Sequence, residues 1–119
     1  RAQVFDRVII GAGATIGGFV CNDAIIGAGA VVFGSIVHRF VDATVGTPEP
    51  APTVGEEAFI GMGAIIIGRV RVGRRAYVAA GTVIACDVPD GRFFKGNPGR
   101  DCGEAPSPFA LRADIQLRE

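Results

Sequence analysis

His38 is the only histidine among the 119 residues, and it precedes a segment with three prolines between residues 47 and 52. An imidazole with its ordinary pKa of about 6.5 takes a proton from an attacking hydroxyl or amine near neutral pH. Proline lacks the backbone N–H that a sheet needs, so residues 38–53 are expected to leave the regular structure as a loop. His38 is therefore a candidate general base; a structural histidine bonded to loop carbonyls is the alternative.

The composition excludes several other kinds of chemistry. Twelve basic and twelve acidic residues give a net charge of zero, which excludes a strongly basic nucleic-acid surface. The three cysteines fit no paired zinc or redox motif, so reduced thiols in a cytoplasmic protein are expected. One histidine cannot supply a three-histidine zinc site, and no metal is expected. The longest apolar run, residues 76–86, is too short to span a membrane.

The elements that hold these residues are expected to be short strands. The chain has 14 valines and 12 isoleucines but only two leucines, both in its last ten residues. Because β-branched side chains suit strands and unbranched ones suit helices, this choice argues against a helical bundle over residues 1–103. The β-branched residues also recur at every sixth position in the second half of the chain, at Val54, Ile60, Ile66, Val72, Val78 and Ile84.

The first half of the chain carries the same six-residue repeat with one shift. Its aliphatic positions are Val4, Ile10 and Ile16, followed by Val20, Ile26 and Val32 in a register displaced by two residues. By this count His38 falls at the next inward position, where the repeat is about to break. Glycine or alanine usually follows the aliphatic residue, as expected where the backbone turns sharply.

A period of six predicts short strands joined by sharp corners. Three such units make a triangular coil of 18 residues, and successive coils stack at the ~4.8 Å spacing of neighbouring strands. The aliphatic positions then form inward ladders, with Val54 under Val72 and Ile60 under Val78. Such arrays are repeat solenoids, in which no single unit buries its core alone. The sequence therefore predicts an all-β solenoid.

With these motifs in place, the chain resembles the hexapeptide-repeat acyltransferase family. Residues 87–91 (DVPDG) and 96–100 (GNPGR) are similar to the segment that closes the helix in galactoside, maltose and nucleotide-sugar acetyltransferases. The resemblance implies a left-handed parallel β-helix and a homotrimer in which the extruded loop reaches a neighbouring subunit. It also supports His38 as the base, since many members use a histidine near such a loop.

The resemblance further implies acetyl-CoA as co-substrate, held along the helix axis between subunits. Matched motif by motif, the coenzyme positions fall on Met62 and Ala80, which lie 18 residues and therefore one coil apart. Ala85 and Cys86 take the place of a common Thr-Lys pair, and Arg100 matches the basic residue that closes the final motif. Ordinary coil and terminus residues are the alternative for all of these.

The expected organisation is a β-helix over residues 1–103 with the loop 38–53, and a tail over residues 104–119. Ser107 and Pro108 form a helix start, so the tail is expected to contain a short helix that covers an end of the coil. The expected function is acetyl transfer from acetyl-CoA to the amine or hydroxyl of a small polar acceptor, such as a sugar or nucleotide sugar. The alternative is a non-catalytic solenoid used for assembly or regulation.

Overall fold

The computed structural model describes residues 2–39 and 50–106, and every element in these ranges is a strand. The strands are β1 (Gln3–Val4), β2 (Ile9–Ile10), β3 (Thr15–Ile16), β4 (Phe19–Val20), β5 (Ile25–Ile26), β6 (Val31–Val32), β7 (Ser35–Val37), β8 (Thr53–Val54), β9 (Phe59–Ile60), β10 (Ile65–Ile67), β11 (Arg71–Val72), β12 (Tyr77–Val78), β13 (Val83–Ile84), β14 (Arg92–Gly96) and β15 (Gly99–Glu104). Strands of two or three residues are what the six-residue repeat predicts.

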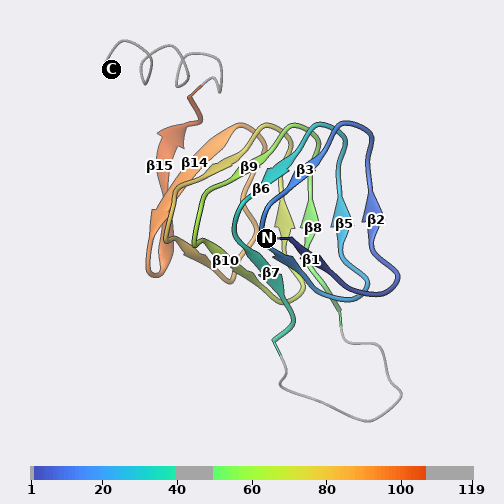
Figure 1. The fold of residues 1–119 in the computed structure, drawn as a ribbon. Helices are drawn as coiled ribbons and strands as arrows, with labels where there is room; N and C mark the ends of the chain where they lie inside the picture. The colour runs from blue at the N-terminus through green and yellow to red at the C-terminus, as the bar shows by residue number, and fades with distance from the viewer. Residues whose placement is uncertain (1, 40–49, 107–119) are drawn as a thin grey trace, which may run out of the picture.

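The strands form the three faces of a triangular solenoid (Figure 1). Sheet A has the order β1-β4-β7-β10-β13, sheet B has β11-β8-β5-β2, and sheet C has β15-β14-β12-β9-β6-β3. Each strand pairs in parallel with the strand one coil away, except for the antiparallel pair β14–β15. The fold is a left-handed parallel β-helix, so the predicted fold class is confirmed.

The coils have two lengths. After the segment between β7 and β8, Thr53 pairs with Arg71 and Phe59 with Tyr77, which gives the predicted 18 residues per coil, and the last step shortens to 16, from Tyr77 to Phe93. Before it, Gln3 pairs with Phe19 and Ile9 with Ile25, so these coils contain 16 residues. The two residues are lost at Gly17–Gly18, which alone join β3 to β4. A side chain at Gly18 would overlap the carbonyl of Gly34 in the next coil, so this tight corner requires glycine.

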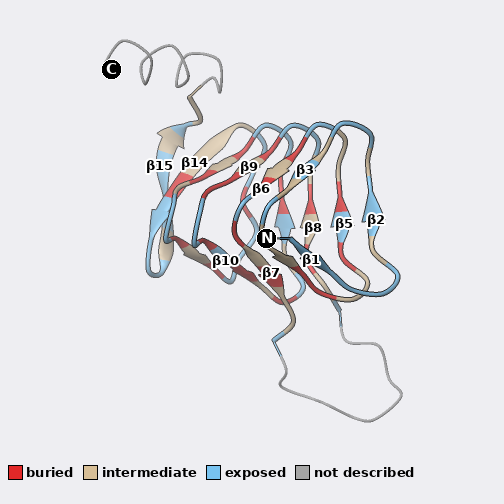
Figure 2. Cartoon of the chain, in the orientation of Figure 1, coloured by how far each residue is buried: buried red, intermediate tan, exposed pale blue. Residues whose placement is uncertain are grey.

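The core is a set of inward ladders that run along the three sheets (Figure 2). The six aliphatic residues predicted from Val54 to Ile84 are all at most 1% exposed, which confirms the repeat. Small residues such as Ala58, Ala64 and Ala76 fill the corners and are also buried. No helix among the described residues is long and apolar enough to cross a membrane.

His38 does not occupy the inward position that the repeat predicted. Because each early coil is two residues shorter, Val20 pairs with Ile36, and Ile36 is the fully buried residue. His38 follows β7 and is only half-buried at the corner beyond it. This correction moves the imidazole from the core to the surface, where a catalytic group has to be.

A hairpin that the sequence did not predict closes the C-terminal end. Strand β14 extends sheet C through the pair Tyr77–Phe93, and β15 folds back on it across the turn at Asn97–Pro98, a cis peptide. Phe94 points into the core and is buried, and Gly99 lies directly over Ile84. The cover therefore comes from residues 92–104. The predicted helix begins at Ser107 and lies outside the described residues, as do residues 40–49 of the predicted loop.

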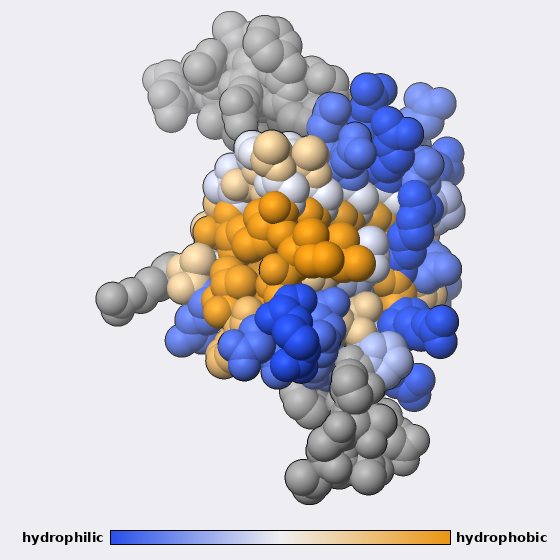
Figure 3. Space-filling view, turned by 90° about the vertical axis from the view of Figure 1, so that its right-hand side faces the viewer, coloured by the Kyte–Doolittle hydropathy of each residue, from blue (hydrophilic) through white to orange (hydrophobic). Residues whose placement is uncertain are grey.

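The N-terminal end of the solenoid is open and apolar (Figure 3). Val4 and Ile10 occupy inward ladder positions, yet they are 44% and 42% exposed because no coil precedes theirs in the structure. Phe5 and Ile9 of the same coil are also exposed. The equivalent residues of the next coil, Val20 and Ile26, are buried.

Candidate functional site

The predicted site residues other than Arg100 fall at two corners of the triangle, on either side of sheet A. We call the corner between sheets A and B the loop corner; it comprises residues 21–23, 38–39, 68–70 and 85–87. The corner between sheets C and A is the glycine corner, made of residues 61–63 and 79–81. Both corners are columns, because equivalent residues of successive coils stack along the solenoid axis.

Asparagine and aspartate side chains tie the turns of the solenoid to one another. Asn22 Oδ1 accepts the backbone N–H of Asp6 at 2.9 Å, and Asp87 Oδ1 accepts that of Arg71 at 2.9 Å. Each bond joins a corner to the preceding coil, a role in which short polar side chains replace ladder partners. Asp23 also adopts a left-handed backbone conformation with φ 68°, which aspartate tolerates better than most residues. Asn22, Asp23 and Asp87 are therefore corner residues of the solenoid.

His38 is held at the loop corner by a hydrogen bond between its Nε2 and the carbonyl oxygen of Asn22, 2.9 Å long. A carbonyl only accepts, so in a neutral ring Nε2 carries the proton and donates it, and Nδ1 holds the basic lone pair. This bond fixes the orientation of the imidazole one coil above Asn22. The geometry suits a general base that acts through Nδ1.

Asp23 follows Asn22, and its carboxylate forms an ion pair with Arg7 of the preceding coil. Arg7 donates from Nε to Oδ1 at 2.6 Å and from Nη2 to Oδ2 at 3.0 Å. These hydrogen bonds hold the pKa of the Asp23 carboxyl below its ordinary value, although burial acts to raise it. The charges of Arg7 and His38 also lower this pKa. Asp23 is therefore a carboxylate at neutral pH, and His38 lies within its electrostatic reach.

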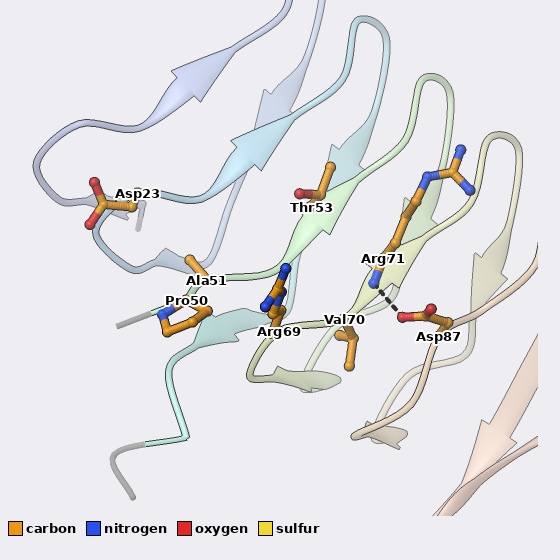
Figure 4. A pocket seen from close by; sticks show the side chains of 8 residues that line it. All are labelled: Asp23, Pro50, Ala51, Thr53, Arg69, Val70, Arg71 and Asp87. Carbon is orange, nitrogen blue, oxygen red and sulfur yellow. Dashed lines mark hydrogen bonds between the residues drawn. The ribbon is translucent and has the colours of Figure 1, made fainter. Parts of the chain in front are cut away.

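A pocket of about 530 Å³ opens at the loop corner beside Asp23 (Figure 4). A volume of this size is typical of small-molecule sites. Figure 4 shows Arg69 in the middle of the group, with Asp23 on one side and Asp87 on the other. The lining residues are Asp23, Pro50, Ala51, Thr53, Arg69, Val70, Arg71 and Asp87. The pocket thus combines apolar walls with charges of both signs.

The glycine corner has the geometry that the sequence predicted for Met62 and Ala80. The two residues are exposed on adjacent coils, and the carbonyl of Met62 accepts the N–H of Gly81 at 3.0 Å. A Cβ added at Gly61 would lie 2.6 Å from the backbone nitrogen of Ala80, so the coils touch here through backbone alone. An extended ligand could therefore approach the main chain along this column.

The other predicted coenzyme residues are not at the glycine corner. Ala85 and Cys86 follow β13 and lie exposed at the loop corner, on the opposite edge of sheet A from Ala80. Arg100 lies in the closing hairpin, where it pairs with Lys95, so the structure brings these two cations together at the end of sheet C. The predicted coenzyme set is thus divided among three places on this chain.

The sequence did not single out the charged residues of the pocket. These residues are Asp23, Arg69, Arg71 and Asp87. The signal that could have found them is the coil length, because steps of 16 residues place Arg7 below Asp23 and Arg71 below Asp87. Within residues 2–39 and 50–106, no group of three His, Cys, Asp or Glu side chains is arranged to hold a metal ion.

Comparison with known proteins agrees with this architecture. Residues 51–86 match the model of the family described as bacterial transferase hexapeptide (six repeats). The chain is 34% identical over 107 residues to a serine acetyltransferase of Bacillus licheniformis, covering 83% of this chain and 50% of that protein. A putative serine acetyltransferase of Schizosaccharomyces pombe is 41% identical over 58 residues, which is 49% of this chain and 22% of the relative. The chain thus spans half or less of the length of these relatives.

Solved structures show the same fold. The soybean serine acetyltransferase apoenzyme superposes with a TM-score of 0.69 at 31% identity, over 79% of this chain and 40% of that one. The serine acetyltransferase of Brucella abortus in complex with coenzyme A gives a TM-score of 0.70 at 24% identity, over 83% and 40% of the two chains. From its repeat, its fold and these matches, the chain belongs to the hexapeptide-repeat family of bacterial transferases.

Proposed function

We propose that this chain forms the catalytic part of an acetyl-CoA-dependent O-acetyltransferase whose acceptor is a small hydroxyl compound of the serine type. The observation that carries the proposal is the match to serine acetyltransferases across 83% of the chain. A loop-corner pocket with both carboxylates and guanidinium groups also fits a zwitterionic amino acid better than an uncharged sugar. Of the amine and hydroxyl that the sequence left open, the proposal takes the hydroxyl, and it takes an amino acid in place of a sugar as the acceptor.

In this proposal acetyl-CoA supplies the activated acetyl thioester, and the protein supplies the base and the positions. The acceptor hydroxyl attacks the thioester carbonyl carbon while Nδ1 of His38 takes its proton. The bond from carbon to sulfur then breaks, and the imidazolium returns the proton to the departing sulfur. The hydrogen bond from Nε2 to Asn22 keeps the ring in the tautomer that this transfer needs. The products are the acetyl ester and a free thiol.

The two corners of one chain lie on opposite edges of sheet A. Strand β10 (Ile65–Ile67) separates Met62 from Gly68, the coil equivalent of His38. Reacting atoms must approach to about 3–3.5 Å. The glycine corner of one copy therefore has to face the loop corner of another.

A homotrimer in which sheet A faces the three-fold axis would join these corners. Contact between two different surfaces closes into a ring when the rotation allows it. Phe19 and Val83 are half-buried on the outer face of sheet A, and Ile65 there is 37% exposed, so this face offers apolar surface to neighbouring copies. The proposal thus assigns His38 to one subunit of each site and Met62 with Ala80 to its neighbour.

Acetyl-CoA is expected to stabilise the protein through the glycine corner. A ligand at 100 times its Kd stabilises the folded state by about 2.7 kcal/mol, which raises the melting temperature by several degrees. The variant Ala80→Phe fills the exposed column beside Gly61, and it should lose this shift while folding normally. Differential scanning fluorimetry with millimolar acetyl-CoA measures both effects.

Ala12→Phe is the matched control for this experiment. Ala12 is an exposed alanine between two glycines at the corner joining sheets B and C, so the same bulk is added at an equivalent turn. This variant should keep the full shift. If acetyl-CoA does not move the melting temperature of the wild type, the coenzyme assignment is wrong and the non-catalytic alternative is favoured. Equal loss in both variants would remove the glycine corner as the binding site.

A further inference from the structure

The charged column at the loop corner contains one break in its alternation of sign. Arg7, Asp23, Arg39 and Arg69 follow one another on this corner from coil to coil, and Asp87 of the next coil lies opposite Arg71. Each carboxylate has a cation as its neighbour, but Arg39 and Arg69 follow each other directly. The side chain of Arg39 lies over Gly68, where an added Cβ would meet its Cγ at a distance that no real contact shows. Two arginines therefore follow each other on this corner, and the second of them, Arg69, lines the pocket.

The neighbouring carboxylates do not neutralise this excess charge. Asp23 is bound by Arg7 through two hydrogen bonds, and Asp87 accepts the backbone N–H of Arg71. The Arg71 guanidinium lies 3.5 Å from Asp90. In the described part of the chain, Arg39 and Arg69 form no ion pair, and of the two only Arg69 lines the pocket. One uncompensated guanidinium therefore faces the pocket.

The surroundings of Arg69 suit a small anion. Pro50 and Ala51 form an apolar wall beside it, and its guanidinium stands between Asp23 and Asp87 without bonding to either (Figure 4). A planar guanidinium binds a carboxylate through two parallel hydrogen bonds, an arrangement that ammonium or amide groups cannot provide. Asp87 of the next coil lines the same pocket and brings a negative charge to it, with its Oδ1 accepting the backbone N–H of Arg71. Opposite charges on adjacent coils match the two charged groups of an α-amino acid.

We propose that Arg69 binds the α-carboxylate of the acceptor and so sets the preference of the enzyme for a hydroxy amino acid over an uncharged alcohol. This proposal rests on the proposed function and names the residue that recognises the acceptor. Arg69 lies on the same corner as His38, whose Nε2 bonds to the carbonyl of Asn22, the residue before the pocket-lining Asp23. An acceptor held at Arg69 is thereby kept on the side of sheet A that carries the base.

The test compares serine with serinamide, which has the same hydroxyl but no carboxylate, by following thiol release from acetyl-CoA. The wild type is expected to use serine at least tenfold better in kcat/KM. Arg69→Gln should reduce that ratio to near one, mainly through a rise of about 10- to 100-fold in the KM for serine. Arg69→Lys, which keeps the charge, should recover part of the preference. Arg74→Gln is the control, because Arg74 is an exposed arginine at the corner between sheets B and C.

Three outcomes would overturn the role of Arg69. The first is a wild type that uses serine no better than serinamide. The second is an equal loss of kcat/KM on serine and on serinamide in Arg69→Gln. The third is a change in that variant of the KM for acetyl-CoA alone, which would assign Arg69 to a coenzyme phosphate. If no hydroxyl acceptor releases thiol, the proposed function fails instead. In that case the rise in melting temperature with serine is compared with the rise with serinamide, in the wild type and in Arg69→Gln. A larger rise with serine that is lost in Arg69→Gln would still show that Arg69 binds a carboxylate.

Discussion

Replacing His38 by alanine is expected to lower kcat for acetyl transfer by about 100- to 10,000-fold, the usual contribution of a positioned general base. The physical reason is that an alcohol is a weak nucleophile unless its proton is removed as it attacks. His38 is half-buried at a corner and lies outside the inward ladders, so the fold should lose little stability. Thiol release under saturating acetyl-CoA measures the first effect, and thermal unfolding measures the second.

His38→Gln provides the matched control for this loss. Its amide can still donate to the carbonyl of Asn22, but it cannot accept a proton at neutral pH. The glutamine variant should therefore be as inactive as the alanine variant, and added imidazole should restore part of the activity of His38→Ala only. Activity retained in either variant would remove His38 as the base and leave it as a residue that orders the corner.

Two inactive variants are expected to restore activity to each other if the site is shared between copies. Co-expression of His38→Ala with Ala80→Phe yields mixed trimers in which some sites combine the intact histidine of one copy with the intact glycine corner of its neighbour. Activity should rise well above that of either variant alone. Light scattering on a sizing column establishes that the mixture is trimeric. Failure to recover activity in such trimers would contradict the division of the site between sheet A edges.

The part of the fold that the sequence predicted is the part governed by local repetition. Each unit needs an inward β-branched residue and a small residue at the turn, and Val54 to Ile84 satisfy both in sequence order. Because every coil faces the same packing problem, one unit predicts the next. The exposed stacking of Met62 and Ala80 followed from the same count, since their separation equals one coil.

The features that the sequence analysis did not predict arise where the number of residues per coil changes. Phe33 and Gly34 join β6 to β7 through only two residues, as Gly17 and Gly18 join β3 to β4 one coil earlier, and this second shift puts His38 at a corner and Ile36 in the core. The closing hairpin follows from antiparallel pairing of β14 with β15, which a hexad pattern does not encode. The hexad pattern also does not predict the charged residues of the loop corner. Asp23 and Arg69 are far apart in the sequence, and only the folding of the coils brings both to one pocket.

Because the first coil is open on one side, the same substitution at two equivalent isoleucines is expected to lower the free energy of unfolding by different amounts. Ile10 and Ile26 occupy the same inward position of sheet B on adjacent coils, but Ile10 is 42% exposed and Ile26 only 1%. Ile26→Ala leaves a cavity between two coils and should cost about 2–5 kcal/mol of unfolding free energy. Ile10→Ala removes contacts on one side only and should cost about 1 kcal/mol or less.

Urea denaturation of both variants measures this difference, with the slope compared to check that both unfold in the same manner. The pair is matched in residue type, substitution and ladder position, so burial by the neighbouring coil is the variable that differs. A loss for Ile10→Ala as large as that for Ile26→Ala would show that the end face is covered in solution. Val4, Phe5 and Ile9 would then belong to an interface, since large exposed apolar patches mark such surfaces.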